Sequence, residues 1–209
     1  RWRTSRACRP EPRARRRVTA RQHQHPGYPT MPMKLIILDR DGVINVDSDQ
    51  FIKSPEEWKP IPGSLEAIAR LNQWGWRVVV ASNQSGVGRG LFGMDTLNAI
   101  NDKMVRSLAQ VGGRLDAIFF CPHAADSTCD CRKPKPGLLL QIAERFNVEL
   151  TDVPVVGDSL RDLQAAVAVG AKPYLVLTGK GETTRNDPAL PEGTLIYPDL
   201  DAVAAELTA

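Results

Sequence analysis

Two aspartates, Asp39 and Asp41, directly follow a short apolar run in the sequence. The run, Lys34–Leu38, predicts a strand buried in a parallel sheet. Side chains two positions apart leave a strand on the same side, so both carboxylates would face the crevice at the carboxyl ends of the strands. Two carboxylates placed in this way can share a divalent cation or divide the roles of nucleophile and acid. The Asp-x-Asp pattern alone is also common in solvated turns.

Polar side chains follow three further predicted strands, which span 77–81, 115–120 and 153–156. In chain order they are Ser82, Asn83 and Gln84, then Arg132 and Lys133 beyond a cysteine-rich loop, and finally Asp158. In a parallel sheet all of these strand ends lie at one edge. Carboxylates, a hydroxyl and cations gathered there are suited to hold a phosphate group and a hard cation such as Mg²⁺. Each residue singly has a plainer explanation as a turn former, a helix cap or a solvated lysine.

The cysteine-rich loop contains Cys121, His123, Cys129 and Cys131. Three sulfurs and one imidazole match a closed tetrahedral zinc site, which leaves no position open for water or substrate. We therefore expect a structural zinc that stiffens the loop leading to Lys133. The alternatives are a group of free buried cysteines and a zinc knuckle that binds nucleic acid, although the loop lacks the aromatic residues on which bases stack.

The elements that would position these residues alternate between strand and helix. Helices are predicted over 64–74, 95–111, 137–146 and 163–169 and from about residue 200, and further strands over 173–177 and 195–197. Asp95 is the expected cap of the second helix. Such alternation implies right-handed crossovers and a largely parallel sheet with helices on both faces, an α/β three-layer sandwich. No connection is long enough to hold a large cap domain.

Charge is unevenly distributed along the 209 residues. Residues 1–32 hold nine arginines and one acidic residue, which leaves 18 basic and 23 acidic residues for 33–209. We expect 1–32 to be a basic extension outside the fold. It is either a disordered arm or a transit-like peptide, or, as we favour, not part of the natural protein, which would then start at Met31 or Met33. Residues 33–209 are expected to form the single folded domain. The acidic composition of that domain speaks against nucleic acid as a partner. No apolar run is long enough to cross a membrane.

The four strand-end motifs resemble those of the haloacid dehalogenase superfamily of phosphatases. The resemblance covers Asp39-Arg-Asp41-Gly, Ser82, Lys133 and Gly157-Asp158, in the order in which they occur in that superfamily. It implies a Rossmann-like sheet and a phosphoaspartyl mechanism, in which Asp39 is the nucleophile and Asp41 the general acid and base. It further implies that Ser82 and Lys133 hold the transferring phosphoryl group. Asp39, the backbone carbonyl of Asp41, and Asp158 would bind Mg²⁺.

Three longer segments, 39–47, 82–90 and 129–137, are similar to the D-glycero-D-manno-heptose 1,7-bisphosphate 7-phosphatases. That subgroup supplies ADP-heptose precursors for bacterial lipopolysaccharide, which implies a small phosphorylated sugar as substrate, a cytoplasmic location and a monomer. The implied substrate contacts are Asp47, Ser48, Asp49, Gln50, Ser82, Asn83, Gln84, Ser85, Arg132 and Lys133. Ser48, Asp49 and Gln50 are included only because they lie in the loop that overhangs the site. Ser159 stands where the subgroup often has lysine.

Other functions compete with this interpretation. Histidinol-phosphate phosphatases share the zinc loop and the catalytic motifs, and nucleic-acid 3′-phosphatases resemble the segment 82–90. A zinc-stabilised binding module without catalytic activity is an alternative of a different class. Asp39 and Asp41 speak against it, because a scaffold has no reason to bury two neighbouring carboxylates.

Overall fold

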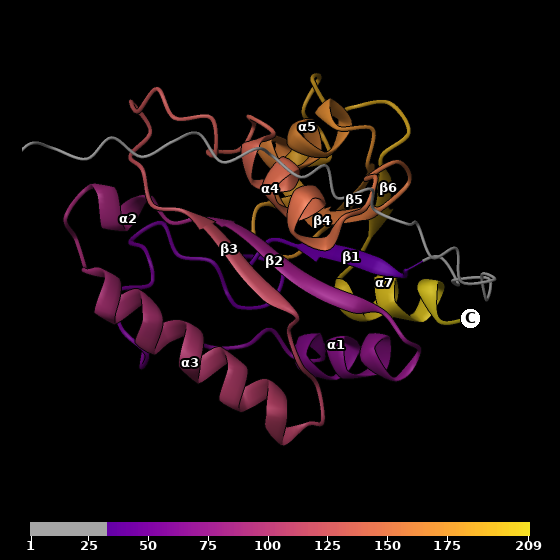
Figure 1. The fold of residues 1–209 in the computed structure, drawn as a ribbon, viewed down its shortest axis with the longest axis horizontal. Coiled ribbons are helices and arrows are strands. Elements are labelled where there is room, and N and C mark those ends of the chain that lie inside the picture. The colour runs from indigo at the N-terminus through magenta and orange to yellow at the C-terminus, as the bar shows by residue number, and fades with distance from the viewer. Residues whose placement is uncertain (1–32) are drawn as a thin grey trace, which may run out of the picture. The chain divides into compact units, whose positions relative to one another are not determined.

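The computed structural model describes residues 33–209, which form a six-stranded sheet with helices on both faces (Figure 1). The strands are β1 (Leu35–Leu38), β2 (Arg77–Asn83), β3 (Ala117–Cys121), β4 (Pro154–Gly157), β5 (Lys172–Val176) and β6 (Leu195–Tyr197). All pairs are parallel, and the strand order is β3-β2-β1-β4-β5-β6. The order reverses between β1 and β4, the position at which open α/β sheets bind their ligands.

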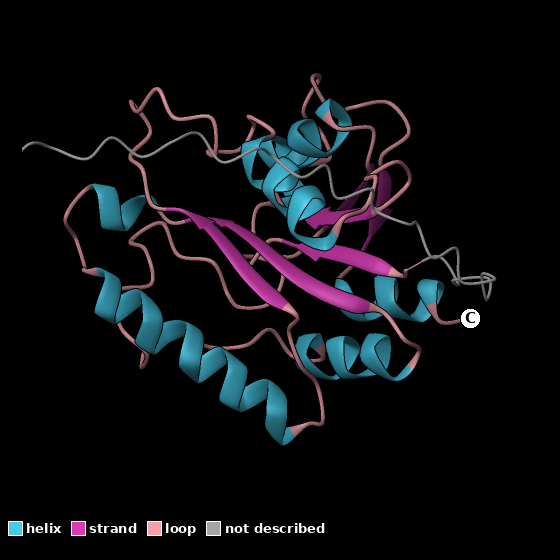
Figure 2. Ribbon diagram, in the orientation of Figure 1, coloured by secondary structure: helices cyan, strands magenta, loops and turns pink. Residues whose placement is uncertain are grey.

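Seven helices accompany the strands in the described part of the chain, and the last of them follows β6 (Figure 2). They are α1 (Ser64–Gln73), α2 (Ser85–Gly88), α3 (Met94–Gln110), α4 (Gly137–Phe146), α5 (Leu160–Ala168), α6 (Gly181–Thr184) and α7 (Leu200–Leu207). None of these helices is both long enough and apolar enough to span a bilayer.

The strands bury both of their faces, as expected for a sheet covered on each side. Alternate residues of β1 belong to different cores: Ile36 and Leu38 face one, and Leu35 and Ile37 face the other. The first core contains side chains of α1, α3 and α7, and the second contains side chains of α4 and α5. The three-layer α/β prediction is therefore confirmed. The two layers also fix β1 on both sides, and Asp39 follows directly on its last buried residue.

Most predicted elements are present, with shifted ends. β2 continues two residues beyond the predicted 77–81, because its pairing with β3 extends to Asn83 and Cys121. The cap assigned to Asp95 is wrong: Gly93 occupies the N-cap position of α3, and Asp95 lies in its first turn. Helix α5 begins at Leu160, before the predicted 163, because Ser159 and Asp162 form a capping box there. The short helices α2 and α6 were not predicted. The prediction for 1–32 lies outside the described residues.

Candidate active site and metal centres

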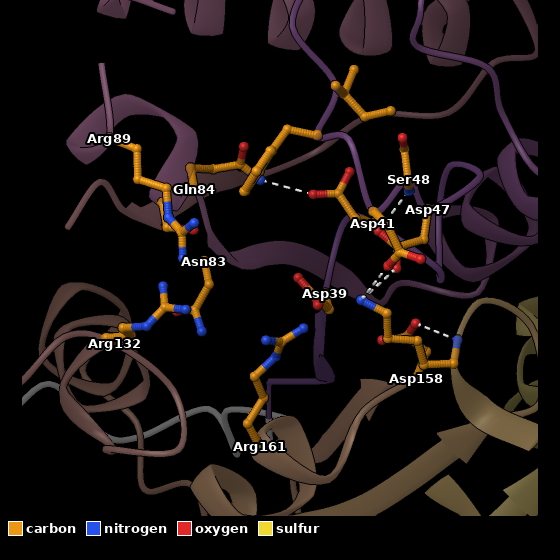
Figure 3. A pocket seen from close by; sticks show the side chains of 15 residues that line it. Asp39, Asp41, Asp47, Ser48, Asn83, Gln84, Arg89, Arg132, Asp158 and Arg161 are labelled. Atoms are coloured by element: carbon orange, nitrogen blue, oxygen red, sulfur yellow. Dashed lines mark hydrogen bonds and ion pairs between the residues drawn. The ribbon is translucent and has the colours of Figure 1, made fainter. Parts of the chain in front are cut away.

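A pocket of about 230 Å³ opens at the carboxyl ends of the strands (Figure 3). Asp39 and Asp41 reach it from β1, Asn83 and Gln84 from β2, and Asp158 from β4. These positions are up to 119 residues apart in the sequence, yet their side chains surround one cavity. The convergence of strand ends that the sequence predicts is therefore present.

Asp39 is 8% exposed, and its Oδ1 accepts a hydrogen bond from the backbone N of Arg40 at 2.7 Å. The Lys133 Nζ lies 3.2 Å from the same oxygen. Burial raises the pKa of Asp39 to about 6; Lys133 opposes this rise, whereas Asp162 adds to it. The carboxylate therefore needs positive charge around it to stay ionised.

Lys133 is 3% exposed and has three acceptors around its ammonium group. They are Oδ1 of Asp162 at 2.6 Å, the carbonyl oxygen of Ala81 at 2.6 Å, and Oδ1 of Asp39 at 3.2 Å. Burial by itself would lower the pKa of Lys133, but the two carboxylates raise it above its ordinary value. The side chain of Asn83 holds the Lys133 backbone, accepting from its N at 3.1 Å and donating to its carbonyl at 3.0 Å. Lys133 is thus a fixed cation.

Asp158 is 2% exposed and completes the acidic side of the site. The backbone N of Lys180 donates to its Oδ2 at 2.8 Å, and the Thr184 hydroxyl donates to its carbonyl at 2.8 Å. A Cβ at Gly42, where φ is +81°, would collide with this carboxylate. Burial and the charge of Asp39 raise the pKa of Asp158 to about 8.

The carboxylates of Asp39, Asp158 and Asp162 have oxygens within 4.8 Å of one another. Both oxygens of Asp162 are already occupied, Oδ1 by Lys133 and Oδ2 by the backbone N and the hydroxyl of Ser159. Asp39 and Asp158 therefore remain as the candidate carboxylate ligands. Mg²⁺ is held by carboxylate oxygens, and the raised pKa values of this pair mark a deficit of positive charge that a divalent cation would correct. The donor set fits Mg²⁺.

Asp41 lies in a dense network of donors. Its Oδ1 accepts from Arg40 Nε at 3.2 Å, Arg40 Nη2 at 3.0 Å and Asn45 Nδ2 at 2.9 Å. Its Oδ2 accepts from Arg40 Nη2 at 3.0 Å and Gln84 Nε2 at 2.9 Å. The indole N–H of Trp58 donates to Asn45 Oδ1 at 3.0 Å and fixes that amide. Although burial opposes it, the Arg40 charge and these hydrogen bonds lower the pKa of Asp41.

Cationic side chains line the outer part of the pocket. Arg89, Arg132 and Arg161 belong to it, and Figure 3 shows their guanidinium groups pointing toward its middle. Lys180 forms ion pairs with Asp47 at 3.1 Å and Asp49 at 3.4 Å. The outer wall thus presents three arginines together with one neutralised lysine.

The second centre comprises Cys121, His123, Cys129 and Cys131. The Cys121 Sγ lies 3.7 Å from that of Cys129 and 3.2 Å from that of Cys131, and the His123 Nδ1 lies 3.5 and 3.2 Å from the sulfurs of Cys121 and Cys131. These separations exceed a disulfide bond and are close to the ~3.4–3.8 Å edges of a tetrahedron around zinc. Although burial raises it, hydrogen bonds from Ser127 and Cys131 lower the pKa of Cys129 to about 6. Burial raises the pKa of Cys121 and that of Cys131, so it is the geometry of the four donors that fits Zn²⁺.

The other predicted substrate contacts are placed unequally. Asp47, Ser48, Asp49 and Ser85 line the pocket together with Asn83, Gln84 and Arg132. Gln50 is exposed and lines a separate hollow. Ser82 is 2% exposed and is not among the residues that line the pocket, and its Oγ accepts from Gln84 Nε2 at 2.8 Å. Which of these side chains touch a substrate stays a prediction.

Several functional residues were missed from the sequence. Arg40 has no predicted role, yet it is 1% exposed and paired with Asp41. Asp162 lies one residue before the predicted helix 163–169, and it holds Lys133. Lys180 follows a fifth strand end whose polar residues drew no prediction, although Thr178-Gly-Lys180 after an apolar run is the same signal as at the other four ends. Ser159 stands where the subgroup often has lysine, so a cation is missing at that position. Arg161, two residues later, lines the pocket.

Comparisons with known proteins agree with this geometry. The family described as "Polynucleotide kinase 3 phosphatase" matches residues 34–164, and a HAD-hydrolase-like family matches 130–203. The D-glycero-beta-D-manno-heptose-1,7-bisphosphate 7-phosphatase of Bordetella bronchiseptica is 62% identical over 84% of this chain and 98% of its own length. The relative of the same name from Pseudomonas putida is 56% identical over 84% of this chain and 99% of its own.

Solved structures give the same result. The crystal structure of the D,D-heptose 1,7-bisphosphate phosphatase from B. bronchiseptica, complexed with magnesium and phosphate, superposes with a TM-score of 0.83 and covers 84% of this chain and 98% of that one, at 62% identity. The corresponding enzyme from Burkholderia thailandensis gives a TM-score of 0.69 at 55% identity, over 84% of this chain and 99% of that one. The chain belongs to the HAD-like hydrolases, and within them to the family of the D-glycero-beta-D-manno-heptose-1,7-bisphosphate 7-phosphatases.

Proposed function

We propose that this protein is a Mg²⁺-dependent phosphatase that removes the 7-phosphate of D-glycero-beta-D-manno-heptose 1,7-bisphosphate. A relative that is 62% identical carries that name, and a crystal structure at the same identity contains magnesium and phosphate. The observation that carries the proposal is the position of Asp39 at the pocket, 3.2 Å from the fixed ammonium group of Lys133. A carboxylate beside a buried cation is suited to attack phosphorus, because the cation also attracts the anionic group under attack.

In the first step one carboxylate oxygen of Asp39 attacks phosphorus, an O–P bond forms, and the bond to the sugar oxygen breaks. Asp41 in its protonated form gives its proton to that departing oxygen. Lys133 and the hydroxyl of Ser82 neutralise the phosphoryl oxygens. Mg²⁺, held by Asp39 and Asp158, would offset the repulsion between carboxylate and phosphate.

In the second step Asp41, now ionised, removes a proton from water as the water attacks phosphorus. Inorganic phosphate leaves and the Asp39 carboxylate is regenerated. The Arg40, Asn45 and Gln84 donors around Asp41 favour its ionised form, which is the form that this second step requires.

The three arginines of the outer wall support a substrate with a second phosphate. Among residues 33–209, the ion pairs of the structure include none from Arg89, Arg132 or Arg161. Guanidinium groups that have no carboxylate partner are suited to bidentate binding of phosphate in a pocket. We therefore assign the 1-phosphate to this wall and the 7-phosphate to Asp39. Histidinol phosphate has only one phosphate and would leave the wall without a partner.

We further infer that 33–209 is a monomeric catalytic domain that works in the cytoplasm. The free thiols of the candidate zinc centre suit a reducing compartment. The deciding experiment measures Mg²⁺-dependent phosphate release from heptose 1,7-bisphosphate, histidinol phosphate and a 3′-phosphorylated oligonucleotide. We expect the highest kcat/KM for the heptose bisphosphate. Preference for either of the other two substrates would refute the assignment.

A further inference from the structure

The side chain of Gln84 connects the general acid and base to the residue that holds the phosphoryl group. It is 5% exposed, and its Nε2 donates to Asp41 Oδ2 at 2.9 Å and to Ser82 Oγ at 2.8 Å. Its Oε1 accepts from Arg40 Nη2 at 3.0 Å. All three polar contacts are therefore made inside the protein, although one face of the side chain borders the pocket (Figure 3).

The orientation of this amide is fixed by its partners. A guanidinium group only donates hydrogen bonds, so the amide oxygen of Gln84 must face Arg40 and its NH₂ group must face Asp41 and Ser82. The backbone of Gln84 is held as well, because its N donates to the carbonyl of Cys121 at 2.7 Å. The amide thus presents two aligned donors to two residues of the proposed reaction.

This orientation has a consequence for the Ser82 hydroxyl. Its oxygen already accepts from Gln84, so its own proton is directed to a different acceptor. In the proposed reaction, a phosphoryl group bound to Asp39 would supply such an acceptor. On the other side, Gln84 is the single donor to Asp41 Oδ2 besides Arg40, within the described residues. Without the Gln84 amide, neither the Ser82 hydroxyl nor the Asp41 carboxylate would be held in one orientation by this contact.

We propose that Gln84 is a positioning residue for the phosphatase reaction, which aligns the Asp41 carboxylate for proton transfer and turns the Ser82 hydroxyl toward the phosphoryl group. This inference rests on the proposed function. It differs from the expectation that Gln84 contacts the sugar, because it assigns the amide to two neighbouring side chains. If Gln84 has this positioning role, its substitution should lower the phosphatase rate most for substrates whose leaving group must be protonated.

The test compares Gln84→Met, which keeps the volume and removes both donors, and Gln84→Glu, which keeps the acceptor for Arg40 and replaces the donors. Each is assayed with heptose 1,7-bisphosphate, whose alkoxide must be protonated, and with para-nitrophenyl phosphate, whose phenolate leaves without a proton. We expect kcat/KM for the sugar to fall by about 10- to 100-fold, part of the 10²–10⁴-fold that general acid catalysis supplies. The fall in kcat/KM for para-nitrophenyl phosphate should be smaller than that for the sugar by a factor of at least about ten. A burst of nitrophenol should appear, because the second step still needs Asp41 as a base.

Gln110→Met is the matched control, since Gln110 is exposed at the end of α3 and should leave both rates unchanged. Circular dichroism and zinc content check that the variants are folded. Equal losses of kcat/KM on both substrates in the Gln84 variants, or no loss on either, would overturn the inference. Activity of the wild-type protein on the sugar would still support the proposed function in that case. A wild-type protein inactive on both substrates would overturn the function and the inference together. If Gln84→Met does not fold, the same comparison with Gln84→Glu decides.

Discussion

Lys133 and Asp39 are buried 3.2 Å apart, although 94 positions separate them in the sequence. Lys133 reaches this place on a loop whose backbone is clamped by Asn83 and whose preceding turn contains the cysteine and histidine cluster. Its ammonium group also meets Asp162 at 2.6 Å. One cation therefore neutralises two buried carboxylates, and both the stability and the reaction should depend on it.

Replacement of Lys133 by methionine keeps most of the volume and removes the charge. Asp39 and Asp162 are then left buried without a cation, so we expect the free energy of unfolding to fall by about 3–5 kcal/mol. Phosphatase kcat should fall by about 10²–10³-fold, as for the loss of one preorganised electrostatic contact. Denaturant unfolding and steady-state kinetics measure the two effects. Lys59→Met is the control, because Lys59 is exposed; an equal change in that variant would argue against the account.

Zinc should be needed for activity without taking part in the chemistry. The His123→Ala variant loses one of the four ligands, and we expect substoichiometric zinc, a lower thermal midpoint and a lower kcat, because the loop no longer presents Lys133 rigidly. Atomic absorption, thermal unfolding and kinetics follow these changes. Asp126→Asn in the same loop is the control, since Asp126 is exposed and lies outside the cluster. Full activity in zinc-free protein would contradict the structural role.

Mg²⁺ binding should strengthen as the pH rises. The pKa of Asp39 is raised to about 6 and that of Asp158 to about 8, and both carboxyls must lose their protons to bind the cation. Isothermal titration at pH 6 and pH 8 should give tighter binding at pH 8. Asp158→Asn should weaken binding and flatten this dependence. Equal affinity at the two pH values in the unmodified protein would show that the carboxyls are already ionised.

The same shifts set the stability of the metal-free protein. Both carboxyls have folded-state pKa values above their ordinary ones, so they favour the folded state most at low pH. That contribution is lost as the pH rises through about 6 and then about 8. Mg²⁺ binds the ionised carboxyls, and these are more abundant at pH 8 than at pH 6. Addition of Mg²⁺ should therefore raise the thermal midpoint more at pH 8 than at pH 6.

Arg161 should distinguish a bisphosphate from a monophosphate. We expect Arg161→Gln to raise KM for heptose 1,7-bisphosphate by about tenfold, the equivalent of one weakened charge-assisted contact. The 7-monophosphate should be hydrolysed with unchanged kcat/KM. Arg145→Gln, an exposed position on α4, serves as the control. Equal effects on the two substrates would remove Arg161 from the 1-phosphate site.

The sequence predicted the fold and the convergence of polar strand ends on one pocket, because both depend on local signals. Asp39, Ser82 and Asp158 each come at the end of an apolar run, and the parallel topology brings such ends together. Cys121 and its partners have the spacing of a closed zinc site. Element ends were less accurate: β2 runs on to Asn83 because of its neighbour β3, a tertiary contact that no local pattern reveals.

The residues that hold the centre in place were harder to predict. Arg40 and Asp162 are charged residues in ordinary-looking positions, and their burial results from partners contributed by other elements. Asn45 and Trp58 form a relay to Asp41 through a loop whose path the sequence does not specify. Supporting contacts of this kind follow from the packed structure, whereas the candidate reacting groups are predicted from the motifs.

The stereochemical course at phosphorus tests the central claim most directly. A heptose bisphosphate whose 7-phosphate is made chiral with oxygen isotopes is hydrolysed, and the configuration of the released phosphate is determined. Each in-line displacement inverts phosphorus, so attack by Asp39 followed by attack of water predicts overall retention. Overall inversion would mean that water attacks the substrate directly and that Asp39 is not the nucleophile.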